Sequence, residues 1–170
     1  QEQTEKAMDK LKEIAERIAG ADALLIGAGN GLSITEGLHL FADNRAFEEL
    51  FGELKRRYGI SCILGGMVAR WPSEEEYWGF WSRLIRHYCI GYSPSACMKN
   101  LRTIAGGKDC FVLTTNGECH FEMSGFAPEN IYEVEGTWLA MQCSRGCHGS
   151  LYPCEELAGK MAAFEKDGRV

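Results

Sequence analysis

The chain has 170 residues, 45% of them hydrophobic, and its 24 acidic and 18 basic residues give a net charge of −6. This length and hydrophobic content predict one domain with a buried core. The acidic balance and the lack of a long Lys/Arg run exclude nonspecific nucleic-acid binding. No stretch reaches the roughly 20 apolar residues of a membrane span, and the first residues are too polar for a signal peptide, so we expect a cytoplasmic protein without membrane contact.

A helix, a strand and a glycine-rich loop are expected first. Apolar residues recur at helical spacing from Thr4 to Ala19, with Gly20 as the stop. Ala23–Ile26 reads as a buried strand that runs into Gly27-Ala28-Gly29-Asn30-Gly31. Because glycines lack a Cβ, such a loop can adopt positive φ and bring N–H groups close to a phosphate. A tight strand-to-helix turn without a ligand is the alternative interpretation.

The rest of the chain alternates helical stretches with strands. Ser73 is a good N-cap, because the three glutamates after it place negative charge at a helix N-terminus. Further helices are expected at Arg45–Tyr58, from about Pro94 to Ile104, and at Cys154–Phe164, with an irregular segment at Ser61–Arg70 and buried strands at Asp109–Thr114 and Asn130–Val134.

This order predicts an α/β fold in which a Rossmann-like parallel sheet carries a helical small-domain insert. Within one domain spanning 1–170, residues 20–35 and 107–136 would form the core, 36–106 the helical insert, and 137–170 a small-domain or C-terminal segment. Because the carboxyl ends of parallel strands meet at one edge, three segments should converge on one crevice. They are Gly27–Ser33, Thr114–Glu118 and Val134–Trp138.

Taken in order, these three segments resemble the motifs of sirtuins over roughly residues 20 to 153. The matching pattern is GAG followed by Ser33 and Gly37, then Thr-Thr-Asn with an acidic residue, then an apolar strand that ends before Gly136. The resemblance implies that the chain binds NAD across a Rossmann-like domain and cleaves its nicotinamide–ribose bond. It also implies binding roles for the loop residues and for the Thr-Thr-Asn segment, namely Gly27, Ala28, Gly29, Leu32, Ser33, Thr115, Asn116 and Glu118.

The resemblance implies catalytic roles for three of the strand-end side chains. Asn116 would orient the ribose or the attacking nucleophile, and Glu118 the nicotinamide amide. Glu135 stands where deacylating sirtuins have a catalytic histidine, and it would steady positive charge on the ribose or help to deprotonate an acceptor. A solvated strand-end carboxylate without a role is the alternative for Glu135. His120 and His148 read as surface or structural histidines, and Arg45 as a charge at a helix start.

Several departures from the usual sirtuin motifs are similar to the macrodomain-linked microbial branch, called class M. They are the longer GAGNGLS loop, Thr-Thr-Asn followed by Phe121, Ser124-Gly125-Phe126, and the late run from Gln142 to His148. Members of that branch are protein mono-ADP-ribosyltransferases, and their acceptor is a lipoyl-carrier protein related to the glycine-cleavage H protein. The resemblance therefore implies this activity and acceptor. The alternatives are a non-catalytic module that binds NAD or ADP-ribose and, less favoured, an NAD-dependent deacylase.

Seven of the eight cysteines fall into two groups. We expect Cys62, Cys89, Cys97 and Cys110 to be reduced and buried. Thiolates and an imidazole make zinc binding chemically possible in the later run, but no CxxC pair is present, so we expect no metal there and keep only weak zinc candidates: Cys143, Cys147, His148 and Cys154. Because sirtuins have further strands after the small domain and this sequence stops at Val170, we also expect a fold that is incomplete at its C-terminal side.

Overall fold

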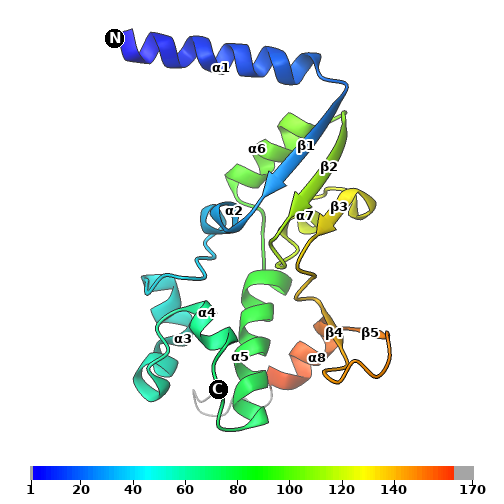
Figure 1. Ribbon diagram of the computed structural model, residues 1–170. Helices are drawn as coiled ribbons and strands as arrows, with labels where there is room; N and C mark the ends of the chain where they lie inside the picture. The colour runs from blue at the N-terminus through cyan, green and yellow to red at the C-terminus, as the bar shows by residue number, and fades with distance from the viewer. Residues whose placement is uncertain (1, 163–170) are drawn as a thin grey trace.

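The computed structural model describes residues 2–162, and a three-stranded parallel sheet organises one part of them (Figure 1). Strand β1 (Ala23–Ala28) pairs with β2 (Asp109–Thr114), and β2 pairs with β3 (Ile131–Glu133). The register sets Ala28 beside Thr114 and Thr114 beside Glu133, so the three strands end at the same level. This confirms the expected parallel sheet and the expected convergence of its carboxyl ends.

Short helices cover one face of this sheet. A cluster of buried side chains joins them to β2, with Met98 from α6, Phe121 from α7 and Val112 from the strand. Leu32 of α2 packs against the same cluster. The covering elements are α2 (Asn30–Thr35), α6 (Ala96–Ala105) and α7 (His120–Met123), and the 3₁₀ turn η2 (Pro128–Asn130) precedes β3.

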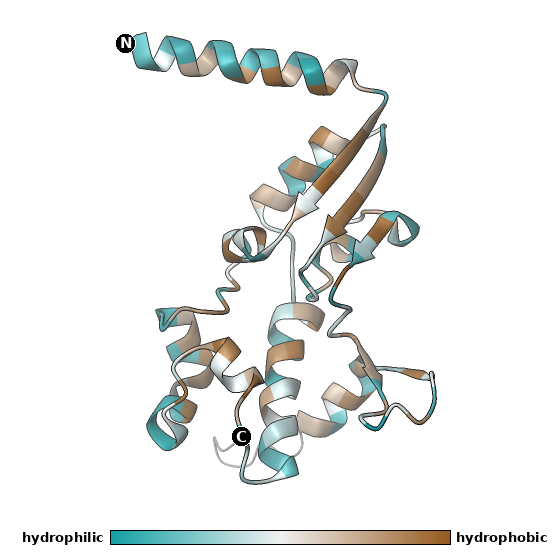
Figure 2. Ribbon diagram, in the orientation of Figure 1, coloured by the Kyte–Doolittle hydropathy of each residue, from teal (hydrophilic) through white to brown (hydrophobic). Residues whose placement is uncertain are grey.

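The opposite face of the sheet is exposed, which corrects the expectation of fully buried strands. Leu25 is 73% exposed, and Phe111 and Leu113 are each 43% exposed. Figure 2 shows the hydrophobic colouring that runs along β1 and β2. Within the described residues, the helices that pack against this cluster lie on only one face of the sheet. Buried and exposed side chains therefore alternate along the strands.

Helix α1 (Glu2–Gly20) confirms the expected first helix and extends away from the sheet (Figure 1). None of its residues is buried, and Met8 and Leu11 of its apolar stripe are 62% and 60% exposed. Neither α1 nor any other helix between residues 2 and 162 combines the length and apolarity that crossing a membrane requires.

The second part of the fold is helical and lies beyond the carboxyl ends of the strands (Figure 1). Phe47, Phe51, Phe80 and Leu84 form the centre of its core. A two-stranded antiparallel hairpin completes this part. Its elements are α3 (Arg45–Tyr58), α4 (Ile63–Met67), α5 (Glu74–Ile85), the π-helix η1 (Arg86–Ile90), β4 (Ala140–Gln142), β5 (Leu151–Pro153) and α8 (Cys154–Met161).

Local capping signals explain the helix boundaries that the sequence predicts well. The Asn44 side chain accepts a hydrogen bond from the N–H of Phe47, and Gly59 ends α3 with a left-handed φ of 71°. Ser73 caps α5 as expected by accepting from the N–H of Glu76 at 3.3 Å. Helix α8 begins at Cys154 as expected, and the expected end at Phe164 lies outside the described residues.

Two expectations about local structure are wrong. The segment expected to be irregular contains α4, which begins where the Cys62 sulfur accepts from the N–H of Gly65 at 3.4 Å. Of the four cysteines expected to be buried, only Cys89 is fully buried, and Cys97 is exposed in the first turn of α6.

Gly66 is where the helical core depends most tightly on a missing side chain. A Cβ at this position would lie 2.4 Å from the ring of the fully buried Phe80. We therefore expect Gly66→Ala to lower the free energy of unfolding by about 1–3 kcal/mol through overpacking. The neighbouring Gly65→Ala is the matched control, because its Cβ would meet Cys62 Sγ at an ordinary 3.5 Å. A gain of about 0.5–1 kcal/mol is expected there. Equal urea midpoints for the two variants would contradict this account of the core.

Candidate functional site

The glycine loop turns directly from β1 into α2. Gly29 is the N-cap of α2 and has an extended backbone, with φ of −148°. None of Gly27, Gly29 and Gly31 has a positive φ, so the expected conformational reason for these glycines is wrong. The glycines leave open space instead, since a Cβ at Gly27 or Gly31 would meet no atom within 4 Å. The side-chain oxygen of Asn30 in the same loop is buried and has no hydrogen-bond partner among the described residues.

Asn116 connects the second strand-end segment to this loop. Its side-chain amide donates to the Gly29 carbonyl at 3.0 Å, and its backbone N–H donates to Thr114 Oγ1 at 3.0 Å. The N–H of Thr115 also donates to the carbonyl of Ala28, at 3.2 Å. These bonds hold the segments after β1 and β2 together, as the sequence predicts.

Ser33 and Glu118 form a buried pair beneath the two loops. The Ser33 hydroxyl donates to Glu118 Oε1 at 2.6 Å, and the two residues are 2% and 3% exposed. A hydrogen bond to an ionisable carboxyl in such a place is strong and fixes the orientation of the side chain. Leu32, the other expected binding residue of α2, packs against the sheet cluster.

The third segment places its carboxylates differently from the expectation. Glu135 is exposed in the turn after β3, and no hydrogen bond or ion pair joins it to Asn116 or Glu118 within the described part of the chain. The turn tightens at Gly136, whose φ is 84°. Glu133, the last residue of β3, is the carboxylate that points inward, and the sequence reasoning missed it. Its signal was the alternation of Ile131, Tyr132 and Glu133 along the strand, which puts the first and third side chains on one face.

Glu133 lies in a polar cluster with Cys119 and Glu122, whose candidate ligand atoms are within 4.8 Å of one another. Burial, together with the charge of Glu122, raises the pKa of the Glu133 carboxyl to about 7. The Cys119 sulfur lies 2.8 Å from the hydroxyl of Thr137, and burial raises the pKa of that thiol to about 12. The cluster therefore contains a carboxyl that changes charge near neutral pH and a thiol that stays protonated.

Three of the four weak zinc candidates lie together. The ligand atoms of Cys143, Cys147 and His148 are within 4.8 Å of one another, and the two sulfurs are 3.2 Å apart. Cys154 is not part of this group, because it is buried at the start of α8 in a separate hydrophobic cluster. The group thus offers three exposed or half-exposed donors on the loop between β4 and β5.

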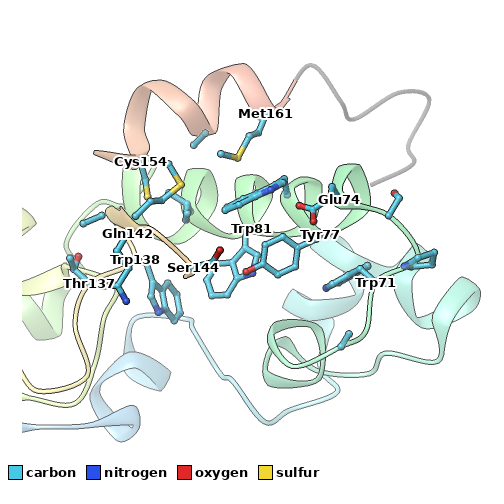
Figure 3. Close-up of a pocket in the computed structure, with 18 residues that line it drawn as sticks. Trp71, Glu74, Tyr77, Trp81, Thr137, Trp138, Gln142, Ser144, Cys154 and Met161 are labelled. Carbon is cyan, nitrogen blue, oxygen red and sulfur yellow. The ribbon is translucent and has the colours of Figure 1, made fainter. Parts of the chain in front are cut away.

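A cavity of about 810 Å³ lies between α5, α8 and the segment after β3. Figure 3 shows Trp81 and Tyr77 between Trp138 on one side and Trp71 on the other. We call this cavity the aromatic pocket. Trp138 joins the pocket to the strand-end segments, because its backbone N–H donates to the carbonyl of Gly117 at 2.7 Å. Trp78 and Trp81 both line this pocket, whereas Arg45 is exposed and pairs with Glu49 on α3.

Known proteins show what this arrangement is similar to. No family model matches the chain. It is 27% identical over 147 residues to a protein ADP-ribosyltransferase of Staphylococcus aureus (strain Mu50 / ATCC 700699), covering 86% of this chain and 46% of that protein. It is 29% identical over 136 residues to a probable bifunctional ADP-ribose hydrolase/ADP-ribosyltransferase of Fusarium oxysporum f. sp. cubense, covering 78% of this chain and 22% of that protein. The chain thus spans about half or less of the curated relatives that it matches.

Among solved structures, the chain is similar to a mutant Sir2 homologue in complex with 2′-O-acetyl ADP ribose. The TM-score is 0.53 at 14% identity, over 83% of this chain and 52% of that one. This likeness confirms the expected fold: a Rossmann-like α/β fold of the Sir2 type. The chain is therefore similar in fold to a Sir2 homologue and similar in sequence to two proteins that are named as ADP-ribosyltransferases.

The raised pKa of Glu133 makes a prediction about pH and stability. The folded state holds the proton of the Glu133 carboxyl more tightly than the unfolded chain does. The contribution of this proton to the free energy of unfolding is therefore present below about pH 4.5 and is lost as the pH rises through about 7. Glu133→Gln removes the titration. We therefore expect the free energy of unfolding of the variant to increase relative to wild type between about pH 5 and pH 8, in urea titrations. Parallel stability curves over this range would contradict the burial of this carboxyl.

Proposed function

We propose that this chain contains the NAD site of a sirtuin-like protein mono-ADP-ribosyltransferase. The observation that carries the proposal is the level end of three parallel strands, where Asn116 binds the glycine loop and Glu118 is held by Ser33. Open α/β sheets bind their ligands at this edge. The names of the two curated relatives support the activity, and the ligand of the Sir2 homologue supports an ADP-ribose unit at this place.

The residues present fit NAD. Open space beside Gly27 and Gly31 admits a diphosphate close to the backbone. The unpartnered side-chain oxygen of Asn30 can accept a hydrogen bond from a ribose hydroxyl. One carboxyl oxygen of Glu118 accepts a hydrogen bond from Ser33, and the second can accept one from the N–H of a carboxamide.

When bound, NAD supplies a glycosidic bond whose cleavage releases nicotinamide and leaves positive charge on the ribose. In the proposed mechanism Glu118 holds the nicotinamide amide, and Asn116 orients the ribose and the incoming nucleophile. Holding the nicotinamide and the ribose in place lowers the activation barrier of bond cleavage, because the reacting groups are already oriented before the reaction begins. Glu135, at the rim, is proposed to steady the developing charge or to accept a proton from the acceptor.

The residue at the strand end separates transfer from deacylation. A histidine there can act as a general base near neutral pH, whereas this chain has Glu135 in an exposed turn. We therefore propose that ADP-ribose is transferred to a protein side chain and that the chain is not an efficient deacylase.

For the acceptor, we propose a lipoyl-carrier protein of the H-protein type. The aromatic pocket supports an acceptor that presents an apolar group, because it has five aromatic rings along its walls. The pocket begins at Thr137 and Trp138, two and three residues after Glu135. An acceptor whose side chain is modified at the strand edge could therefore place a neighbouring apolar group in this pocket.

Asn116→Ala tests this function. With labelled NAD and a lipoyl-carrier acceptor, we expect label transfer to fall at least about a hundredfold, because the ribose and the nucleophile lose their orientation. Asn130→Ala is the matched control, since Asn130 is exposed at the end of η2 and lies outside the site. It should transfer label at the wild-type rate.

Other outcomes would point to other functions. Saturable NAD binding without transfer or nicotinamide release would favour the non-catalytic binding module, which the exposed position of Glu135 also fits. Robust deacetylation that depends on Asn116 would overturn the argument from Glu135.

A further inference from the structure

His120 is a buried histidine that the proposed mechanism does not use. It is the first residue of α7 and is only 3% exposed. Its ring stacks on that of Tyr92, with centroids 3.7 Å apart and planes inclined by 10°. On its edge it faces Glu118, the carboxylate at the centre of the candidate site.

The hydrogen bonds of His120 fix the position of its proton. Nε2 lies 2.7 Å from the backbone carbonyl of Tyr88. A carbonyl only accepts, so Nε2 carries a hydrogen and donates it. In a neutral ring, Nδ1 is then a lone pair without a hydrogen.

Nδ1 has no hydrogen-bond partner among the described residues, although it is buried. Glu118 Oε1 lies 3.6 Å from it. A bare lone pair facing a carboxylate oxygen in a buried site is repulsive, and an unsatisfied buried polar atom is costly. A proton on Nδ1 removes both costs, because Nδ1 can then donate toward Glu118 Oε1.

The groups around the ring oppose one another. Burial lowers the pKa of His120, whereas the Tyr88 carbonyl and the charges of Glu118 and Glu36 act in the opposite direction. Glu36 follows α2 and is itself held in place, since Tyr92 Oη donates to Oε2 at 2.6 Å and Ser95 Oγ donates to Oε1 at 2.5 Å. The titratable side chains that face the ring are therefore Glu118, Glu36 and Tyr92.

We propose that His120 is a positioning residue for Glu118, and that a proton shared by this pair holds the carboxyl in place for the ligand. Oε1 is occupied by Ser33 and by the shared proton, which leaves Oε2 to accept from a ligand N–H. When the proton is lost, the lone pair and the carboxylate repel, and Glu118 moves from this position. The inference rests on the proposed function for the identity of the ligand, but the pairing itself does not.

Histidine NMR on the wild-type chain tests the pairing without any ligand. We expect Nε2 to carry a hydrogen throughout the titration and Nδ1 to take up the shared proton as the pH falls. In Glu118→Gln, we expect a His120 pKa about one unit lower, because a nearby negative charge is gone. Glu129→Gln, at an exposed position on η2, is the control and should leave the His120 titration unchanged. Identical titrations of His120 in wild type and Glu118→Gln would overturn the proposal.

NAD titrations then test the consequence for the site. In wild type, we expect the Kd for NAD to rise about tenfold as the pH increases through the titration of the pair, which corresponds to one pKa unit of coupling. In His120→Gln this dependence should shrink to about twofold or less. His87→Gln, at an exposed position in η1, should keep the wild-type profile. A full pH dependence retained in His120→Gln would overturn the positioning role.

The two proposals can fail separately. If His120→Gln does not fold, as circular dichroism would show, the NMR comparison of wild type with Glu118→Gln decides the pairing. If wild type binds no NAD at any pH while His120 still responds to Glu118→Gln, the pairing is supported and the proposed function is contradicted.

Discussion

The parallel register of three strands is the constraint on which the candidate site depends. Ala28, Thr114 and Glu133 lie side by side at the ends of β1, β2 and β3, so the segments that follow leave the sheet from one edge. The hydrogen bond from the Asn116 side chain to the Gly29 carbonyl then joins two of these segments directly. A slip of one residue in this register would turn every strand side chain to the opposite face and separate these groups.

The carboxylates at this edge of the sheet differ in how deeply they are buried. The carboxyls of Glu118 and Glu133 point inward beneath the loops, where hydrogen bonds and neighbouring charges control them, while Glu135 stays in an exposed turn. The same short stretch of chain thus supplies carboxylates in very different environments. The surroundings of Glu133 raise the pKa of its carboxyl to about 7.

Most of the fold could be predicted because its signals are local. Asn44 and Gly59 bound α3, Ser73 caps α5, and an apolar run forms β2 with the predicted limits. The misses depend on tertiary contacts. Gly66 of α4 lets the Phe80 ring approach closely, which no local pattern reveals. The convergence of the three strand-end segments was predicted from the sequence, whereas the roles of their residues stay predictions. The inward position of Glu133 and the approach of His120 to Glu118 involve side chains that meet only after folding.

The central claim is that the glycine loop and the Thr-Thr-Asn segment together bind an ADP-ribose unit. Amide chemical shifts measured during a titration with ADP-ribose test it most directly. The account predicts that the amides of Gly29 to Ser33 and of Asn116 shift together with a single dissociation constant, while those of the exposed loop around Cys147 do not. Shifts confined to the aromatic pocket, or no shifts at saturating ligand, would contradict it.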